Sequence, residues 1–250
     1  MAEALIHGIH AVAAALKYQP ESLSGLWVER QRRDARIQAL RDEAARRGVP
    51  AHDVDRAELD RLSGGARHQG VIARVTALRP ALGEDDLKEL LAAAAEPALL
   101  LVVDGVQDPH NLGACLRSAA AAGVHAVIAP ADRAVGLTAT VRKVASGAAD
   151  IVPFVSVTNL ARTLRGLQEW GVWTVGAAGE AADTLYAVDF TAPTAIVLGA
   201  EEHGLRRLTR ERCDRLARIP LAESGVESLN VSVAAGIFLF EARRQRGFKG

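Results

Sequence analysis

The chain is poor in cysteine, in aromatic residues and in long apolar runs, and each shortage excludes a class of protein. Cys115 and Cys213 lie far apart, each within a helical pattern, so they predict neither a disulfide framework nor a pair of metal ligands. Two tyrosines and five phenylalanines are too few for the base-stacking platforms of single-strand-binding proteins. No stretch approaches the roughly 18 unbroken apolar residues that span a bilayer, and the N-terminus does not resemble a secretory signal. We therefore expect a cytoplasmic protein with reduced thiols and no membrane partner.

Net charge is absent as well, since 30 Lys and Arg residues balance 30 Asp and Glu residues. The global signature of a strongly basic nucleic-acid binder is missing, so any such surface has to be local. Nearly all the cations are arginine, which suits bidentate phosphate contacts, although a bias in the base composition of the gene explains this equally well. The G-x-G-x-x-G and P-loop fingerprints and Cys-His zinc spacing are also absent. A nicotinamide enzyme, a nucleoside triphosphatase and a metal site therefore find no support.

A short acidic segment divides the chain. With 250 residues, of which 49% are hydrophobic, the chain is long enough for two ordinary domains. Residues 79–96 are bracketed by prolines and contain two basic against five acidic residues, which is typical of a linker, here with a short helix inside it. We therefore expect an N-terminal domain over residues 1–78, a linker over 79–96 and a C-terminal domain over 97–250.

The two parts differ in their hydrophobic rhythm. The N-terminal part predicts a small α/β unit, with helices over 8–16 and 35–47 and strands over 25–28, 49–54 and 71–75. The C-terminal part alternates continuous apolar runs with helical patterns, which predicts a mostly parallel sheet with crossover helices. Its predicted strands cover residues 99–103, 125–129, 151–155, 172–175 and 194–198. Ligands of such sheets bind at the carboxyl ends of the strands, so the loops after these strands are candidate sites.

Two of these loops carry polar residues that suit a site. Asn111 is expected to cap the helix that follows the first C-terminal strand, and Arg117 lies about one and a half turns further along it. A simple cap and a solvated arginine explain both equally well. Glycines at both ends of the turn from Gly199 to Gly204 allow a ligand close to the backbone, and Glu201 lies between them. An ordinary acidic turn is the simpler alternative.

Ser228 and Asn230 lie immediately before the apolar run 233–240, at a predicted helix N-terminus. Free backbone N–H groups and the positive dipole end favour an electron-rich ligand there. Plain capping is the simpler alternative, because serine and asparagine are both good N-caps.

Together, three segments resemble the motifs of a known family. In order and spacing, Asn111-x-Gly113-x-x-x-Arg117, then Gly199-Ala-Glu201-x-x-Gly204, then Ile219-Pro220 with residues 228–232 resemble the three motifs of the SpoU (TrmH) family of RNA 2′-O-ribose methyltransferases. Further stretches resemble the subgroup that acts on a guanosine of bacterial 23S ribosomal RNA. The N-terminal unit resembles the ribosomal-protein-like RNA-binding domain of that subgroup.

The resemblance implies a knotted SPOUT-type parallel-sheet domain, S-adenosyl-L-methionine as cofactor, 23S ribosomal RNA as partner and a homodimer with its active sites at the subunit interface. It also implies two groups of site residues. The catalytic group comprises Asn111, Arg117, Glu201, Ser228 and Asn230. The cofactor-binding group comprises the backbone at Gly199, Ile219 and Leu229, with Gly176, Ala177 and Gly179 nearby.

The role of Arg117 is left open by the sequence. The resemblance allows it to be the base, but a guanidinium with a pKa above about 12 is a poor proton acceptor at neutral pH. We therefore favour binding of the phosphate next to the ribose and stabilisation of the developing alkoxide. Two other functions also remain open, namely a tRNA ribose methyltransferase and a catalytically silent RNA-binding assembly factor.

Overall fold

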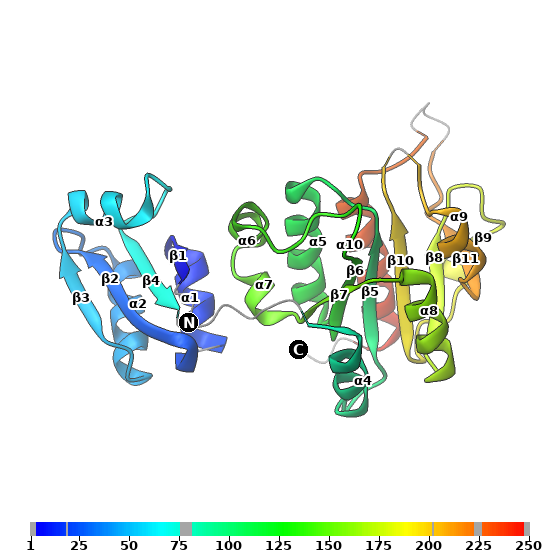
Figure 1. Cartoon of the computed structure of the whole chain (residues 1–250), viewed down its shortest axis with the longest axis horizontal. Helices are drawn as coiled ribbons and strands as arrows, with labels where there is room; N and C mark the ends of the chain where they lie inside the picture. Colours follow the sequence, from blue (N-terminus) through cyan, green and yellow to red (C-terminus); the bar gives the residue numbers. More distant parts are fainter. Residues whose placement is uncertain (1–3, 19, 76–81, 202, 223–226, 248–250) are drawn as a thin grey trace. The chain divides into compact units, whose positions relative to one another are not determined.

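The chain divides into two units, each with its own sheet and hydrophobic core (Figure 1). The first comprises residues 1–80 with the short segment 146–151, and the second comprises residues 81–145 and 152–250. The computed structural model describes residues 4–18, 20–75, 82–201, 203–222 and 227–247. The expected domain boundary between residues 78 and 79 lies outside these described residues.

The first unit is a mixed four-stranded sheet packed against helices. Its strand order is β1-β4-β2-β3, with β2 parallel to β3 and the other two pairs antiparallel. Leu16, Leu26 and Ile37 are fully buried where α1 and α2 meet the sheet. In chain order the unit contains β1 (Ala4–His7), α1 (Ile9–Tyr18), η1 (Pro20–Ser22), β2 (Leu23–Glu29), α2 (Ala35–Arg46), β3 (Ala51–Val54), α3 (Arg56–Ser63) and β4 (Val71–Val75).

The predicted helices and strands of this unit are confirmed to within a few residues, but β1 and α3 were not expected. The signals for α3 are clear once the structure is seen. Asp55 caps the helix by accepting the backbone N–H of Glu58 at 2.8 Å, and Gly64 ends it in the left-handed conformation. The helix is only eight residues long, so its apolar period is too short to be recognised on its own.

The second unit is built on a seven-stranded sheet of order β7-β6-β5-β10-β8-β11-β9, in which every pair is parallel. The chain from residue 82 onward forms α4 (Glu84–Ala92), β5 (Leu99–Asp104), α5 (Pro109–Ala122), β6 (Ala126–Pro130), α6 (Ala139–Ala145), α7 (Ala148–Ile151), β7 (Phe154–Val157), α8 (Leu160–Glu169), β8 (Trp173–Ala177), β9 (Asp183–Thr184), η2 (Leu185–Ala187), β10 (Thr194–Gly199), α9 (Arg207–Glu211), β11 (Arg215–Arg218) and α10 (Val231–Gln245).

All five apolar runs predicted as strands are strands in the structure. The expected strand over 151–155 begins later, at Phe154, because residues 148–151 form α7. Leucines of α4 and α8 pack on one face of the sheet, while α5 and α10 pack together on the other (Figure 1). The expected knot depends on the course of the chain from β11 to α10. Residues 223–226 of that course lie outside the described residues, so the knot stays a prediction.

The expected linker does contain a helix, but the structure packs that helix into the second unit. Leu87 of α4 is fully buried in the core that α8 and the sheet form. Leu82 extends the sheet edge, donating its N–H to the carbonyl of Phe154 at 2.8 Å. Glu84 accepts hydrogen bonds from Arg162 at 2.7 Å and from the Thr163 hydroxyl at 2.8 Å. Most acidic residues of this predicted linker therefore lie on the outer face of an amphipathic helix.

Replacing Leu87 by alanine tests this packing. We expect Leu87→Ala to lower the free energy of unfolding by about 2–5 kcal/mol, because a buried leucine is removed and a cavity remains. Glu89→Ala on the exposed face of the same helix is the control and should change it by less than about 0.5 kcal/mol. Urea unfolding of the full chain, followed by circular dichroism, measures both. Equal, small effects would mean that α4 does not stabilise the unit.

Candidate active site

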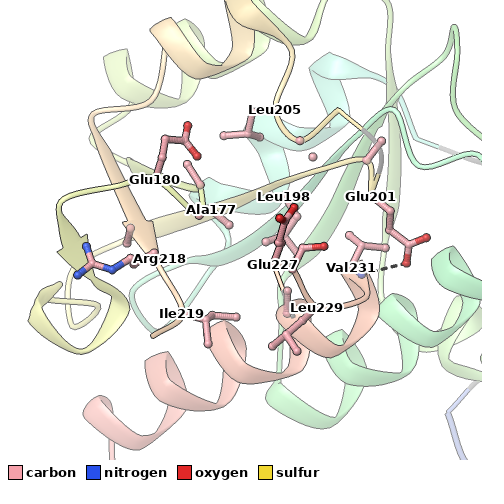
Figure 2. A pocket seen from close by; sticks show the side chains of 18 of the residues that line it. Ala177, Glu180, Leu198, Glu201, Leu205, Arg218, Ile219, Glu227, Leu229 and Val231 are labelled. Atoms are coloured by element: carbon pink, nitrogen blue, oxygen red, sulfur yellow. Dashed lines mark hydrogen bonds between the residues drawn. The ribbon is translucent and has the colours of Figure 1, made fainter. Parts of the chain in front are cut away.

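A cavity of about 330 Å³ lies at the carboxyl ends of β8, β10 and β11 (Figure 2). The loops after these three strands and the start of α10 line it. Much of its wall is apolar, and three carboxylates lie at its border. The apolar side chains include Leu198, Leu205, Ile219, Leu221, Leu229 and Phe238, and the carboxylates are those of Glu180, Glu201 and Glu227. This position is the one that the sheet topology predicts for a ligand.

The turn after β10 crosses closely over its own strand. A Cβ atom on Gly199 would lie 2.0 Å from the carbonyl carbon of Gly204 and 2.2 Å from the backbone nitrogen of Leu205. The turn is closed by a hydrogen bond of 2.8 Å from the N–H of Gly204 to the carbonyl of Ala200. Gly204 itself has a φ of 60°, in the left-handed region. The backbone path thus requires glycine at position 199 and favours it at position 204.

A buried ion pair anchors the far end of this turn. Asp104, at the carboxyl end of β5, is 0% exposed and accepts hydrogen bonds from Arg206, at 3.1 Å from the backbone N–H and 2.5 Å from Nε. A buried carboxylate has to be paired in this way, because leaving it without a partner is costly. Asp104 is not among the site residues predicted from the sequence. The sequence feature that points to it is its position directly after the apolar run 99–103, where an acidic residue is unexpected.

The polar residues of the three motifs meet at the N-terminus of α10. Asn230 caps this helix, its Oδ1 accepting the backbone N–H of Ser232 at 2.9 Å. Its Nδ2 donates to Oδ1 of Asn111 at 2.9 Å and also to the carboxylate of Glu201. Glu201 additionally accepts the N–H of Val231 at 3.3 Å (Figure 2). The carboxylate therefore lies at the positive end of the helix dipole, where a negative charge is stabilised.

A second cavity, of about 480 Å³, lies on the other side of this cluster. It is lined by the loop that follows β5 and by the side chains of Asn111, Arg133 and Arg206. The two cavities share Glu201 and the backbone of the turn around it. Asn111 thus lines the second cavity and Glu201 lines both, while Asn230 joins the two side chains through its amide nitrogen.

The structure brings most of the predicted site residues to these cavities. Asn230 lines neither but is bonded to Asn111 and Glu201, which do, and two further residues are exceptions. Ser228 lines the first cavity, as do the predicted cofactor residues Ala177, Gly179, Gly199, Ile219 and Leu229. Gly176 does not line it. It lies within β8, and a Cβ atom there would come within 2.9 Å of Leu205, Leu216 and Cys213, so its small size serves packing.

Arg117 is the second exception. It lies exposed on α5, and within the described residues no hydrogen bond or ion pair joins it to another side chain. The expected position of Asn111 also needs correction. Asp108 caps α5 by accepting the N–H of His110 at 2.8 Å, and Pro109 occupies the first helical position. Asn111 lies two residues after Pro109 in the first turn of the helix. Its side chain does not cap α5 and instead accepts the hydrogen bond from Asn230.

Neither thiol is suited to be a nucleophile. Burial raises the pKa of Cys115 to about 12, and the carboxylate of Glu201 adds to the shift. Burial likewise raises the pKa of Cys213 to about 12, with contributions from Asp214 and Asp104. Both thiols are therefore protonated at neutral pH. Among the described residues no group of His, Cys, Asp and Glu is placed to hold a metal ion, and no helix is long and apolar enough to cross a membrane.

A parallel sheet with two adjoining cavities at its strand ends defines an enzyme domain of the α/β class. The chain belongs to the SpoU rRNA methylase family, whose match covers residues 98–240. Residues 5–81 match a second family, described as RNA 2′-O ribose methyltransferase substrate binding. The family predicted from the three motifs is thereby confirmed.

Relatives in several bacteria resemble almost the whole chain. The 23S rRNA (guanosine-2′-O-)-methyltransferase RlmB of Ralstonia nicotianae is 56% identical over 242 residues, which cover 97% of this chain and 96% of the relative. The RlmB protein of Vibrio cholerae is 56% identical over 246 residues, 98% of either chain.

Two solved structures share the fold over 98% of this chain. A crystal structure of an RNA 2′-O ribose methyltransferase is 28% identical, with a TM-score of 0.76 and 89% of its chain covered. The SpoU methyltransferase AviRb from Streptomyces viridochromogenes, in complex with AdoMet, is 25% identical, with a TM-score of 0.76 and 90% of its chain covered. The predicted α/β class, a parallel-sheet domain with a small N-terminal sheet unit, is confirmed.

The close crossing at Gly199 can be tested by adding a single methyl group. We expect Gly199→Ala to lower the free energy of unfolding by about 1–3 kcal/mol, because the new Cβ forces the 204–205 backbone away. Gly179→Ala is the control, since a Cβ there meets no atom within 4 Å. Thermal unfolding of the two variants and the wild type gives the comparison. If Gly199→Ala is as stable as Gly179→Ala, the crossing does not constrain the turn.

Proposed function

We propose that the protein transfers a methyl group from S-adenosyl-L-methionine to the ribose 2′-hydroxyl of a guanosine in 23S ribosomal RNA. The observation that carries this proposal is the cluster of Asn111, Glu201 and Asn230 between two cavities, since a transfer reaction needs a donor site and an acceptor site that meet. The names of relatives that are 54–56% identical over most of the chain support the choice of substrate. The cytoplasm, where ribosomal RNA is assembled into ribosomes, is the proposed location.

The first cavity suits S-adenosyl-L-methionine. Its volume lies within the usual range of small-molecule sites, and its apolar walls suit an adenine ring and the methylene groups. The carboxylates of Glu201 and Glu227 suit a ligand that carries positive charge, whereas Glu180 is already paired with Arg210. Backbone groups of Gly199, Ile219 and Leu229 are the proposed hydrogen-bonding partners, with Ala177 and Gly179 alongside. When bound, the cofactor supplies an electrophilic sulfonium methyl group.

The second cavity is the proposed acceptor site. Asn111 and Glu201 face it, and Asn230 joins the two through its amide nitrogen. These groups hold the ribose in line with the first cavity, so that much of the acceleration comes from positioning. Ser228, at the border of the first cavity, is proposed to complete the acceptor site from the other side of the α10 N-terminus.

Arg117 is proposed to bind the phosphate next to the ribose and to stabilise the developing alkoxide. A guanidinium stays protonated at neutral pH, so the proton of the hydroxyl passes to phosphate or to water. Within one chain, no hydrogen bond or ion pair among the described residues joins Arg117 to Asn111, Glu201 or Asn230. We propose that Arg117 instead contributes to the active site of a second copy of this chain.

An apolar stripe on α10 supports a homodimer. Val233 and Phe240 are 49% and 42% exposed, and Gly236 and Ile237 lie partly exposed between them, at the spacing of one helix face. The stripe lies beside α5, the helix that carries Arg117, because a Cβ on Gly236 would lie 3.8 Å from the hydroxyl of Ser118. Exposed apolar patches with polar borders are typical of protein interfaces. A dimer formed here brings Arg117 close to the partner subunit.

The division of labour between the units is the last part of the proposal. Residues 97–250 carry out the transfer, and residues 1–78 provide affinity for RNA. The part of residues 79–96 that packs on the sheet belongs with the transferase domain, because Leu87 completes its core.

Asn111→Ala tests the division between cofactor binding and transfer. Removing the amide leaves Asn230 without its partner on the acceptor side, so we expect the rate of methyl transfer to 23S ribosomal RNA to fall about 100-fold. The affinity for S-adenosyl-L-methionine, measured by isothermal titration, should stay within about threefold, because Asn111 does not line the first cavity. Unchanged turnover would remove Asn111 from the mechanism.

Mixed dimers test whether Arg117 acts across the interface. Arg117→Ala and Asn111→Ala chains, each with a different tag, are produced together and the mixed dimers are purified through both tags. If Arg117 serves the partner's site, one of the two sites in a mixed dimer regains both groups, and activity returns although both parent dimers are inactive. If Arg117 serves its own chain, neither site is complete and the mixed dimers stay inactive.

A further inference from the structure

A cleft in the first unit collects arginines from three separate elements. It has a volume of about 440 Å³ and lies beside the loop that joins α3 to β4. Arg32 and Arg36 come from the start of α2 and the residues before it, Arg56 from the start of α3, and Arg67 from the loop. The only carboxylates in its wall, within the described residues, are those of Glu29 and Asp60.

The arginines of this cleft differ from others in the unit in their pairing. Within the described residues, no hydrogen bond or ion pair joins the guanidinium group of Arg36, Arg56 or Arg67 to another group, and all three side chains are exposed. By contrast, Arg46 and Arg47 of α2 both bind Glu43, and Arg61 of α3 binds Glu58. The cleft therefore has an excess of unpaired positive charge, although the unit as a whole is nearly neutral.

The loop beside the cleft is held in a strained shape. Gln69 has a φ of 51°, rare for a residue with a side chain, and Gly65 and Gly70 are also left-handed, at 82° and 74°. The shape is maintained from several sides. The buried ring of His68 accepts the N–H of Gly70 on Nδ1 at 3.1 Å, which leaves Nε2 to donate to Asp60 at 2.9 Å.

The side chain of Gln69 also ties the loop to α1. Its Oε1 accepts the N–H of Ile9 at 3.2 Å, and its backbone carbonyl accepts a hydrogen bond from Arg32. Arg32 in turn binds Asp34 at 2.7 Å, so it supports the wall rather than offering a free cation. Backbone strain that is held by so many contacts indicates a loop whose shape is needed for binding.

We propose that this cleft binds the sugar-phosphate backbone of the RNA substrate, with the guanidinium groups of Arg36, Arg56 and Arg67 on successive phosphodiesters. This inference rests on the proposed function and locates the RNA contact within the first unit. A guanidinium offers a planar fork of donors that fits phosphate oxygens, and among the described residues no carboxylate is bonded to any of these three, although Glu29 and Asp60 lie in the wall. Asp60, the acid nearest to the loop, is itself engaged by His68.

Two triple variants of the full chain test the proposal, and both remove three positive charges. The cleft variant is Arg36→Gln with Arg56→Gln and Arg67→Gln. The control is Arg46→Gln with Arg47→Gln and Arg61→Gln, which alters the same two helices at arginines that are already paired. The probe is a 23S ribosomal RNA transcript, and its dissociation constant is measured by filter binding between 50 and 200 mM salt.

We expect the cleft variant to bind the transcript about 10- to 100-fold more weakly and to lower the slope of log affinity against log salt by about 2, at roughly 0.7 for each single-strand phosphate that is no longer neutralised. The control should change affinity by less than about threefold, because its arginines are neutralised internally. Arg67→Gln alone should lower the slope by about 0.7, a change that needs no triple substitution. Equal weakening in both triple variants, or none in the cleft variant, overturns the proposal.

Two further measurements separate this inference from the proposed function. Unchanged melting temperatures and unchanged affinity for S-adenosyl-L-methionine in both variants show that the fold and the first cavity are intact. If the wild type binds the transcript through the cleft but transfers no methyl group, the proposed function fails and the RNA site stands. If the wild type methylates the transcript and the cleft variant binds it normally, the RNA site fails and the function stands.

Discussion

The close crossing of backbone at Gly199 is the constraint on which the site depends. The strand β10 can end under the 204–205 backbone only if residue 199 has no side chain. That crossing makes the turn tight, and the tight turn holds Glu201 against the first free N–H groups of α10. The same turn forms a wall of both cavities. One missing methyl group therefore determines where the two cavities meet. The buried Asp104–Arg206 pair fixes the other end of the turn and keeps it from opening.

Much of this architecture could be predicted from the sequence because it follows from local rules. Continuous apolar runs of four to six residues between helical patterns indicate buried parallel strands, and the five strands were found at the expected places. The glycines at 199 and 204 and the asparagine at 230 are required by backbone path and capping, which are also local effects. Their meeting with Asn111 is a tertiary contact over 119 residues and had to be taken from the family resemblance.

What the sequence did not reveal depends on packing partners. Leu87 has the same neighbours in sequence whether its helix is solvated or packed, and only the presence of α8 and the sheet edge buries it. Position 176 has room only for glycine because Leu205, Leu216 and Cys213 surround it. These residues are distant in the sequence, and only the fold brings them to Gly176. The charge balance of the first unit was equally uninformative. Some arginines of this unit pair with acidic residues and others do not. Which of them pair depends on the positions of the side chains in the fold, which the composition does not reveal.

The acids around the first cavity have a consequence for turnover. A sulfonium cofactor loses one positive charge when its methyl group leaves, and the thioether that remains is less strongly attracted to Glu201 and Glu227. Those carboxylates therefore discriminate between the charged donor and the spent product without any change of shape. The exposed position of both acids at the cavity border keeps the attraction moderate. At the proposed cofactor site, the electrostatics that favour binding of the donor would therefore also favour its exchange for the spent product.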